Sequence, residues 1–246
     1  MQVIVMTSDK YLWACRPFMW LWDRYFTPDI SRNNVICGFT PPTFELSKKF
    51  KFYSIGKFED YPFGKWSDAL IRILDNVADE VFMLMLEDYW LTRQVDTKAV
   101  EILYDYMLQF KYTVKIDLCA DRLYAFGADL NYGTVSYIDL VKSMPGSPYH
   151  MSLMAGLWNR DLLKKVIIPG ESPHDVEMVG TVRLSHTEAL VLGTRQWPLR
   201  HTLAFRGQDA SRLLLDDLNH SDVKEMRELG LYQRTTENNE NHRKNL

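Results

Sequence analysis

A short apolar run that ends in two acidic residues constrains this chain more than any other stretch. Val81–Leu86 is apolar throughout, which is typical of a strand that helices cover on both faces. Glu87 and Asp88 follow at the point where this strand would leave the sheet. Since ligand chemistry in open α/β sheets gathers at the carboxyl ends of strands, the pair predicts a divalent cation held against a phosphate group. The same two acids would also fit the start of an ordinary solvated loop.

Length, charge and cysteine content narrow the class of protein. The 246 residues fit one large α/β domain, alone or with a small appendage. A net charge of −3 gives no general attraction to nucleic acid or anionic membranes, which leaves only a local basic groove open. The three cysteines form no close pair, so neither a disulfide framework nor a zinc site is indicated. No apolar stretch reaches the roughly 18–20 residues of a membrane span, and we expect a soluble, cytoplasmic protein.

Hydrophobic periodicity predicts strands that alternate with amphipathic helices, and hence an α/β sheet. The predicted strands are 3–6, 34–37, 50–55 at an edge, 81–86, 113–118, 134–138, 151–158 and 190–192. The predicted helices are 12–26, one after residue 68 that includes 70–77, 97–110, 159–166, one from 173 onward, and 221–229.

Two polar segments stand where a nucleotide would meet such a sheet. Thr7 and Ser8 follow the first strand and precede a helix, a place where backbone N–H groups bind phosphate. Trp66, Ser67 and Asp68 lie immediately before the helix that precedes the central strand. Each segment has a simpler interpretation as a helix cap, with Trp66 as a hydrophobic staple, and the local pattern does not separate the two.

A second acidic cluster follows a sharp break at residues 169–173. Ser172 is a plausible helix cap and Pro173 a first helical residue, so that His174, Asp175 and Glu177 fall in the first turns of a helix. Acids there either complement the helix dipole or act as a general base toward an acceptor hydroxyl.

A ring-rich basic segment precedes the last apolar residues of the domain. It contains Arg195, Trp197, Arg200 and His201. His201 is a candidate ligand for metal or phosphate, although a lone histidine is more often neither. The other three are candidate contacts for an acceptor.

Taken in order, several motifs resemble those of a group of bacterial and phage glycosyltransferases. The matching segments are the strand ending in Thr7-Ser8, then 66–68, 86–90, 152–158 and 169–173 with Glu177. The resemblance covers about residues 1–205 and implies a GT-A-like fold, a mixed, mainly parallel sheet flanked by helices. We expect a C-terminal helical appendage at 206–232 and a disordered tail at 233–246.

The resemblance also implies roles. Asp88, supported by Glu87, would take the place of the family's Asp-x-Asp motif and bind Mn²⁺ or Mg²⁺ with the diphosphate of a nucleotide sugar. Thr7, Ser8 and 66–68 would lie near the nucleotide, and Glu177 or Asp175 would be the base. His174 stands where the family commonly has tryptophan, which implies a different acceptor contact.

The sequence leaves alternatives open for both the acceptor and the activity. A glycan or lipid-linked sugar and a hydroxymethylated base in phage DNA are both compatible with the sequence, and the latter would require a flipped base and basic contacts to phosphates. A non-catalytic module that binds sugar nucleotides or glycans is the second class of function. A nucleotidyltransferase is the third, and it would need a basic triphosphate loop that 7–10 does not supply.

Overall fold

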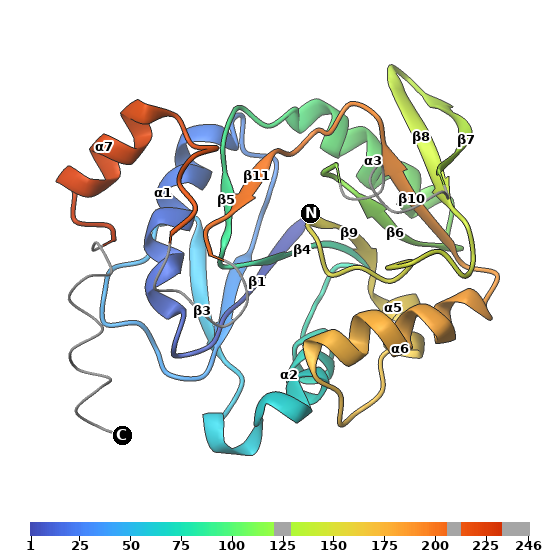
Figure 1. Cartoon of the computed structure of the whole chain (residues 1–246), viewed down its shortest axis with the longest axis horizontal. Helices are drawn as coiled ribbons and strands as arrows, with labels where there is room; N and C mark the ends of the chain where they lie inside the picture. Colours follow the sequence, from blue (N-terminus) through green and yellow to red (C-terminus); the bar gives the residue numbers. More distant parts are fainter. Residues whose placement is uncertain (121–128, 206–212, 233–246) are drawn as a thin grey trace.

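The computed structural model describes residues 1–120, 129–205 and 213–232, and a nine-stranded mixed sheet forms its centre (Figure 1). The strand order is β3-β2-β1-β4-β9-β6-β10-β8-β7. These strands are β1 (Gln2–Met6), β2 (Asn34–Gly38), β3 (Phe50–Ser54), β4 (Val81–Leu86), β6 (Thr113–Asp117), β7 (Asp129–Val135), β8 (Ile138–Ser143), β9 (Gly156–Asn159) and β10 (Leu190–Thr194).

Strand direction confirms the predicted fold class. β3, β2, β1 and β4 are parallel neighbours, and β10 pairs in parallel with β6. Of the strands in this described sheet, β8 and β9 run against the others. The sheet is therefore mixed with mainly parallel strands, and β3 is an edge strand as predicted.

Helices cover both faces of the sheet, as the uninterrupted apolar strand predicts. Along β4, Val81, Met83 and Met85 pack into one core cluster, while Phe82 and Leu84 pack into a second. The first cluster includes side chains from α1 (Cys15–Tyr25) and α3 (Thr97–Gln109), and the second includes side chains from α2 (Trp66–Leu74), α5 (Arg160–Val166) and α6 (Pro173–Ser185). The two groups of helices lie above and below the sheet in Figure 1.

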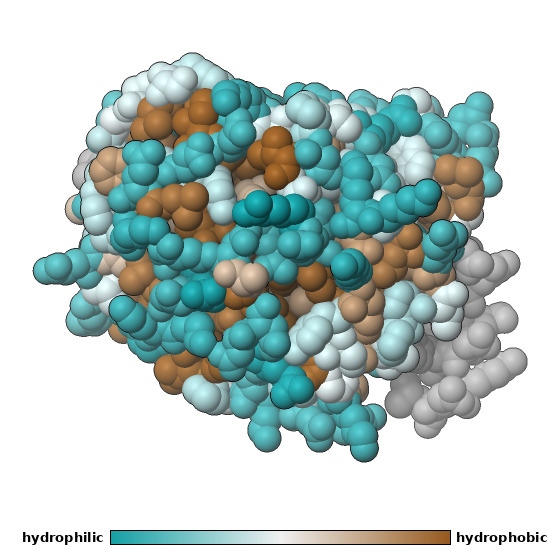
Figure 2. All heavy atoms as spheres, turned by 180° about the vertical axis from the view of Figure 1, so that it is seen from behind, coloured by the Kyte–Doolittle hydropathy of each residue, from teal (hydrophilic) through white to brown (hydrophobic). Residues whose placement is uncertain are grey.

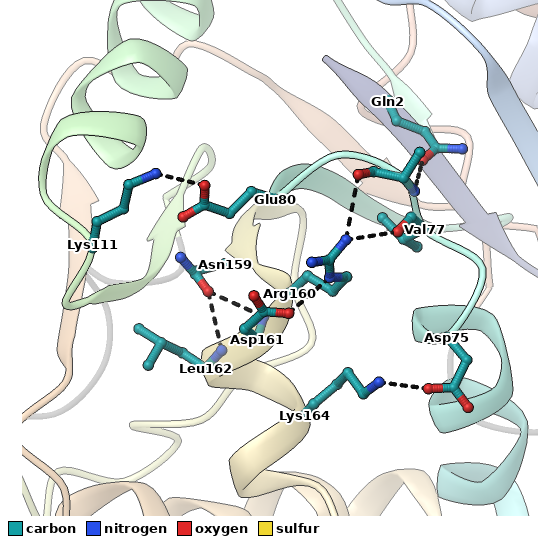
Figure 3. A network of polar contacts seen from close by, with 11 residues as sticks. Gln2, Asp75, Val77, Glu80, Lys111, Asn159, Arg160, Asp161, Leu162 and Lys164 are labelled. Carbon is teal, nitrogen blue, oxygen red and sulfur yellow. Dashed lines mark hydrogen bonds and ion pairs between the residues drawn. The ribbon is translucent and has the colours of Figure 1, made fainter.

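The amino-terminal edge of the central strands is fastened by a polar network that links α2, β9 and α5 (Figure 3). Arg160 donates hydrogen bonds to the carbonyls of Val77 (3.0 Å) and Ala78 (3.3 Å), just before β4. Asn159 caps α5, and Lys164 forms an ion pair with Asp75 at the end of α2. These contacts use caps and surface pairs to hold elements together. The opposite, carboxyl edge carries the candidate site.

Two local predictions need correction, and one small sheet was not predicted. The predicted strand 151–158 is a loop up to Ala155, and β9 begins at Gly156, because residues 152–155 cross the carboxyl edge of the sheet. The predicted strand 134–138 instead spans the turn between β7 and β8. A small second sheet, in which β11 (His201–Leu203) pairs with β5 (Tyr89–Leu91), lies directly after the acidic pair.

The predicted terminal helix is present as α7 (His220–Glu228), which packs beside α1. Arg24 forms ion pairs with Asp222 (3.0 Å) and Glu225 (3.0 Å), and Asp222 also accepts a hydrogen bond from the Tyr25 hydroxyl. The division of the chain after residue 205 stays a prediction, and the tail predicted at 233–246 lies outside the described residues.

The exterior is chemically mixed. Viewed from behind, apolar residues form separate patches between hydrophilic ones (Figure 2). Among the helices of the described segments, none combines the length and apolarity that crossing a bilayer requires.

Candidate functional site

Glu87 and Asp88 lie at the carboxyl end of β4 with their backbone held on three sides. The Glu87 N–H donates to the Met6 carbonyl at the end of β1 (3.3 Å). The Trp90 indole donates to the Glu87 carbonyl (3.1 Å), and the Ala204 N–H donates to the Asp88 carbonyl (2.8 Å). The short β5–β11 ladder thus fixes the turn that carries both acids.

Both carboxyl groups are poorly solvated. Glu87 is 7% exposed, and burial together with the neighbouring Asp88 charge raises its pKa well above the usual range. Burial raises the pKa of Asp88 to about 7. Within the described segments neither acid forms an ion pair, and backbone hydrogen bonds offset only part of the effect of burial on the two pKa values. Buried adjacent acids destabilise a fold, which marks them as candidates for binding or catalysis.

The loop after β1 meets the acidic pair through Cys15. Thr7 is buried, its side chain is hydrogen-bonded to the Cys15 thiol, and that thiol in turn lies within electrostatic reach of Glu87. Burial and, secondarily, the Glu87 charge raise the thiol pKa, so Cys15 is a neutral neighbour rather than a nucleophile. Ser8 is partly exposed beside Thr7. The structure therefore brings together the predicted residues at the ends of β1 and β4.

The segment at the start of α2 is engaged with the turn before α6. Ser67 is fully buried, and its backbone and hydroxyl exchange hydrogen bonds with the backbone of Glu171 (3.0 and 2.9 Å). Asp68 accepts a hydrogen bond from the Gly170 N–H (2.7 Å), while Trp66 is partly buried. These contacts give the predicted nucleotide segment a structural role in holding the turn at 169–171.

The two base candidates on α6 have different surroundings. Asp175 is exposed and completes a capping box with Ser172, and the hydrogen bonds from Ser172 lower its pKa. Glu177 instead accepts a hydrogen bond from the Leu153 N–H (2.8 Å), and the Leu153 carbonyl accepts one from the Tyr89 hydroxyl (3.3 Å). Glu177 is therefore linked through one residue to the strand that follows Asp88. His174 is exposed at the start of α6.

The basic, ring-rich segment divides between two places. His201 lies in β11 with its ring 4.7 Å from that of Tyr89, and burial lowers its pKa to about 4, which keeps the imidazole neutral. Its Nδ1 atom is buried without a hydrogen-bond partner among the described residues. The Arg200 guanidinium covers the Trp197 ring at 4.8 Å. Arg195 is exposed and binds the Asn131 side chain near the β7–β8 hairpin.

The donor chemistry at this edge fits a divalent cation. Mg²⁺-type sites commonly use one or two carboxylates and complete their coordination with water and substrate phosphates. Glu87 and Asp88 supply two adjacent carboxyl groups of this kind. In the described part of the chain, no three His, Cys, Asp or Glu residues lie close enough together to hold a metal ion. His201 therefore does not form a three-residue metal cluster with Glu87 and Asp88.

Sequence patterns did not single out a buried ion pair on β6. Lys115 and Asp117 are both fully buried and contact one another, and Lys115 also donates to the Ser152 carbonyl (2.7 Å) beneath the Trp158 ring. A Cβ atom on Gly156 would approach the Lys115 Cε to 2.8 Å, so glycine is required where β9 begins. The available signal was a lysine and an aspartate two residues apart on one face of an otherwise apolar strand.

Comparisons with known proteins establish neither a family nor an activity. No family model matches the chain, and no curated protein matches it. Similar solved structures include the galactosyltransferase LgtC with donor and acceptor sugar analogs, at 11% identity and a TM-score of 0.43, covering 67% of this chain and 60% of that chain. They also include a CMP:2-keto-3-deoxy-manno-octonic acid synthetase with CTP, at 13% identity and a TM-score of 0.45, covering 92% of this chain and 96% of that chain. A UTP-bound UGPase from Acinetobacter baumannii is similar at 8% identity and a TM-score of 0.49, covering 94% of this chain and 93% of that chain. The chain spans about three fifths of the galactosyltransferase.

Proposed function

We propose that this protein is a nucleotide-sugar-dependent glycosyltransferase whose donor binds at the carboxyl edge of the sheet. The observation that carries this proposal is the pair of adjacent acids at the end of the central strand, with Glu87 buried, Asp88 partly buried and the pKa of both raised by burial. Acids whose pKa values are shifted in this way concentrate at binding and catalytic sites. A divalent cation bound there would neutralise charge on the departing diphosphate.

The neighbouring loop supports binding of the rest of the donor. Thr7 and Ser8 directly follow β1, which pairs with β4, so a nucleotide lying across the ends of these two strands would contact both segments. The buried hydrogen bonds of Ser67 and Asp68 hold the turn before α6 and thereby preserve the shape of this edge. We assign the first pair to donor contacts and the second to positioning.

Glu177 is the favoured general base, with Asp175 as the alternative. The acceptor hydroxyl must lose its proton as the glycosidic bond forms, and a carboxylate near the reacting atoms serves this purpose. Glu177 is tied to the carboxyl edge through Leu153, whereas Asp175 is committed to its helix cap and its lowered pKa makes it the weaker base. Trp197 with Arg200 offers a ring and a guanidinium for the acceptor.

A transfer assay tests this proposal. UDP-, GDP-, CMP- and dTDP-sugars are incubated with Mn²⁺ and either a glycan or lipid-linked sugar mixture or hydroxymethylated DNA, and released nucleotide and labelled acceptor are measured. We expect one donor to be consumed and one acceptor class to be labelled. Binding without turnover would instead identify a non-catalytic module, and release of pyrophosphate from a nucleoside triphosphate and a sugar phosphate would identify a nucleotidyltransferase. Either result would refute the proposal.

A further inference from the structure

A hollow of about 630 Å³ lies between α3 and the β7–β8 hairpin, away from the acidic pair. Rings from both elements line it, together with short polar side chains of the hairpin. The sheet order places β8 four strands from β4. At a strand spacing of about 4.8 Å, β8 is therefore roughly 19 Å from the central strand across the sheet.

The hairpin is fixed to α3 at both ends, so the hollow between them is preformed. At one end the Tyr137 hydroxyl hydrogen-bonds both oxygens of Asp96, the residue that caps α3 (2.9 Å each). At the other end the Tyr132 side chain hydrogen-bonds with those of Tyr106 and Tyr112. These two sets of hydrogen bonds along one helix hold the hairpin in place and keep its middle from collapsing onto the helix.

The lining combines exposed rings with hydrogen-bonding groups that have no partner among the described residues. Phe110 is 37% exposed and Tyr132 38%, and Phe110 stacks on Tyr106 with ring centroids 4.3 Å apart. The side chains of Asp105 and Gln109 line the same space and form no hydrogen bond with the described residues. No lysine or arginine is among the residues that line the hollow in the described part of the chain.

This chemistry selects among ligand classes. Ring faces accept the C–H faces of a pyranose, while carboxylate and amide groups hydrogen-bond vicinal hydroxyls in a fixed plane. A nucleotide or another phosphate ligand would meet a carboxylate and no cation, which opposes binding. The volume lies within the range of small-ligand sites. A neutral carbohydrate satisfies all these features.

We propose that the hollow between α3 and the β7–β8 hairpin binds a neutral oligosaccharide at a site separate from the donor site. The hairpin turn lies at the carboxyl edge, because β7 ends there and β8 begins there. A glycan bound in the hollow would therefore extend toward the edge where Asp88 lies. The binding itself does not require that the protein transfers sugar.

Saturation-transfer NMR and calorimetric titration test the site, with maltotetraose, cellotetraose and chitotetraose as separate probes. We expect saturable binding of at least one probe, weakened roughly tenfold by Phe110→Ala through lost ring contact and burial. Asp105→Ala should weaken it by a similar factor. Asp105 is exposed and should keep the wild-type melting temperature when replaced, so Asp105→Ala tests binding even if Phe110→Ala loses stability with its stacking on Tyr106. Phe63→Ala, which removes a ring 60% exposed elsewhere, is the matched control and should bind normally.

Three results would overturn the proposal. They are the absence of saturable binding with all three probes, equal binding by wild type and the Phe110→Ala variant, and tighter binding of UMP than of any tetraose in the hollow. The Asp88→Asn variant separates the two proposals. It should bind the tetraose like wild type even if donor binding is lost, whereas failure of the glycan site leaves donor binding unaffected.

Discussion

Replacing Asp88 by asparagine should stabilise the metal-free protein at high pH. Burial raises the pKa of Asp88 from 3.8 to about 7, so the folded state holds a proton that the unfolded state has released across this interval. The stability of the wild type therefore falls as pH rises through it, by up to about 4 kcal/mol at about 1.4 kcal/mol per tenfold change in proton affinity. Asparagine has a similar shape and carries no charge, so it avoids this loss.

The pH dependence of the gain is the quantity to measure. Between about pH 5.5 and pH 8 the stability of Asp88→Asn relative to wild type should increase by about 2 kcal/mol. Losing the Asp88 charge also removes its repulsion of Glu87, which acts in the same direction. Urea unfolding with EDTA at the two pH values measures the difference, and Asp60→Asn at an exposed acid is the control. A gain that is equal at both pH values, or a loss at pH 8, would refute the reasoning.

Three further predictions concern the surrounding residues. Glu177→Gln should keep the hydrogen bond to Leu153 and hence the fold, yet lower the transfer rate by about 10²-fold or more with donor binding unchanged; an unaltered rate excludes Glu177 as base. Lys115→Met should lower the unfolding free energy by about 3–5 kcal/mol, because Asp117 becomes an uncompensated buried charge, and a loss below 1 kcal/mol in urea melts would contradict this. Ser172→Ala should cost about 1 kcal/mol by removing the cap of α6, with transfer kinetics largely retained; equal melting curves would disprove the cap's contribution.

The sequence predicted the parallel half of the fold well, because those strands are encoded locally. β1, β2 and β4 are short apolar runs flanked by turns, and alternate residues of β4 face two helical layers, as a doubly covered strand requires. The capping box of α6 was likewise predictable, since Ser172 and Pro173 are local signals. These elements depend on periodicity and caps rather than on distant partners.

Pairings between strands far apart in the chain could not be predicted from the sequence. An apolar run does not record strand direction, so nothing indicated that β9 would insert antiparallel between β4 and β6. The pairing of β5 with β11 joins residues more than a hundred positions apart over three residue pairs. The loop before β9 depends on Lys115 reaching the Ser152 carbonyl, a contact that exists only after the sheet has assembled.

The candidate site was predictable in composition and less so in geometry. The acids at the end of β4 could be named from the sequence because they interrupt an apolar run. Their burial could not, since it depends on α1 and on the β5–β11 ladder. The different surroundings of Asp175 and Glu177 also required the structure, because Asp175 contacts its own helix cap and Glu177 contacts Leu153.

Calorimetric titration of nucleotide sugars tests the central assignment most directly. UDP-, GDP-, CMP- and dTDP-sugars are titrated into wild type and Asp88→Asn, each with Mn²⁺ or with EDTA. The assignment predicts one donor that binds wild type with Mn²⁺ and binds at least tenfold more weakly without the metal or without the Asp88 carboxylate, about 1.4 kcal/mol or more. Equal affinity in the variant, or no binding by any donor, would contradict a metal–diphosphate site at the end of the central strand.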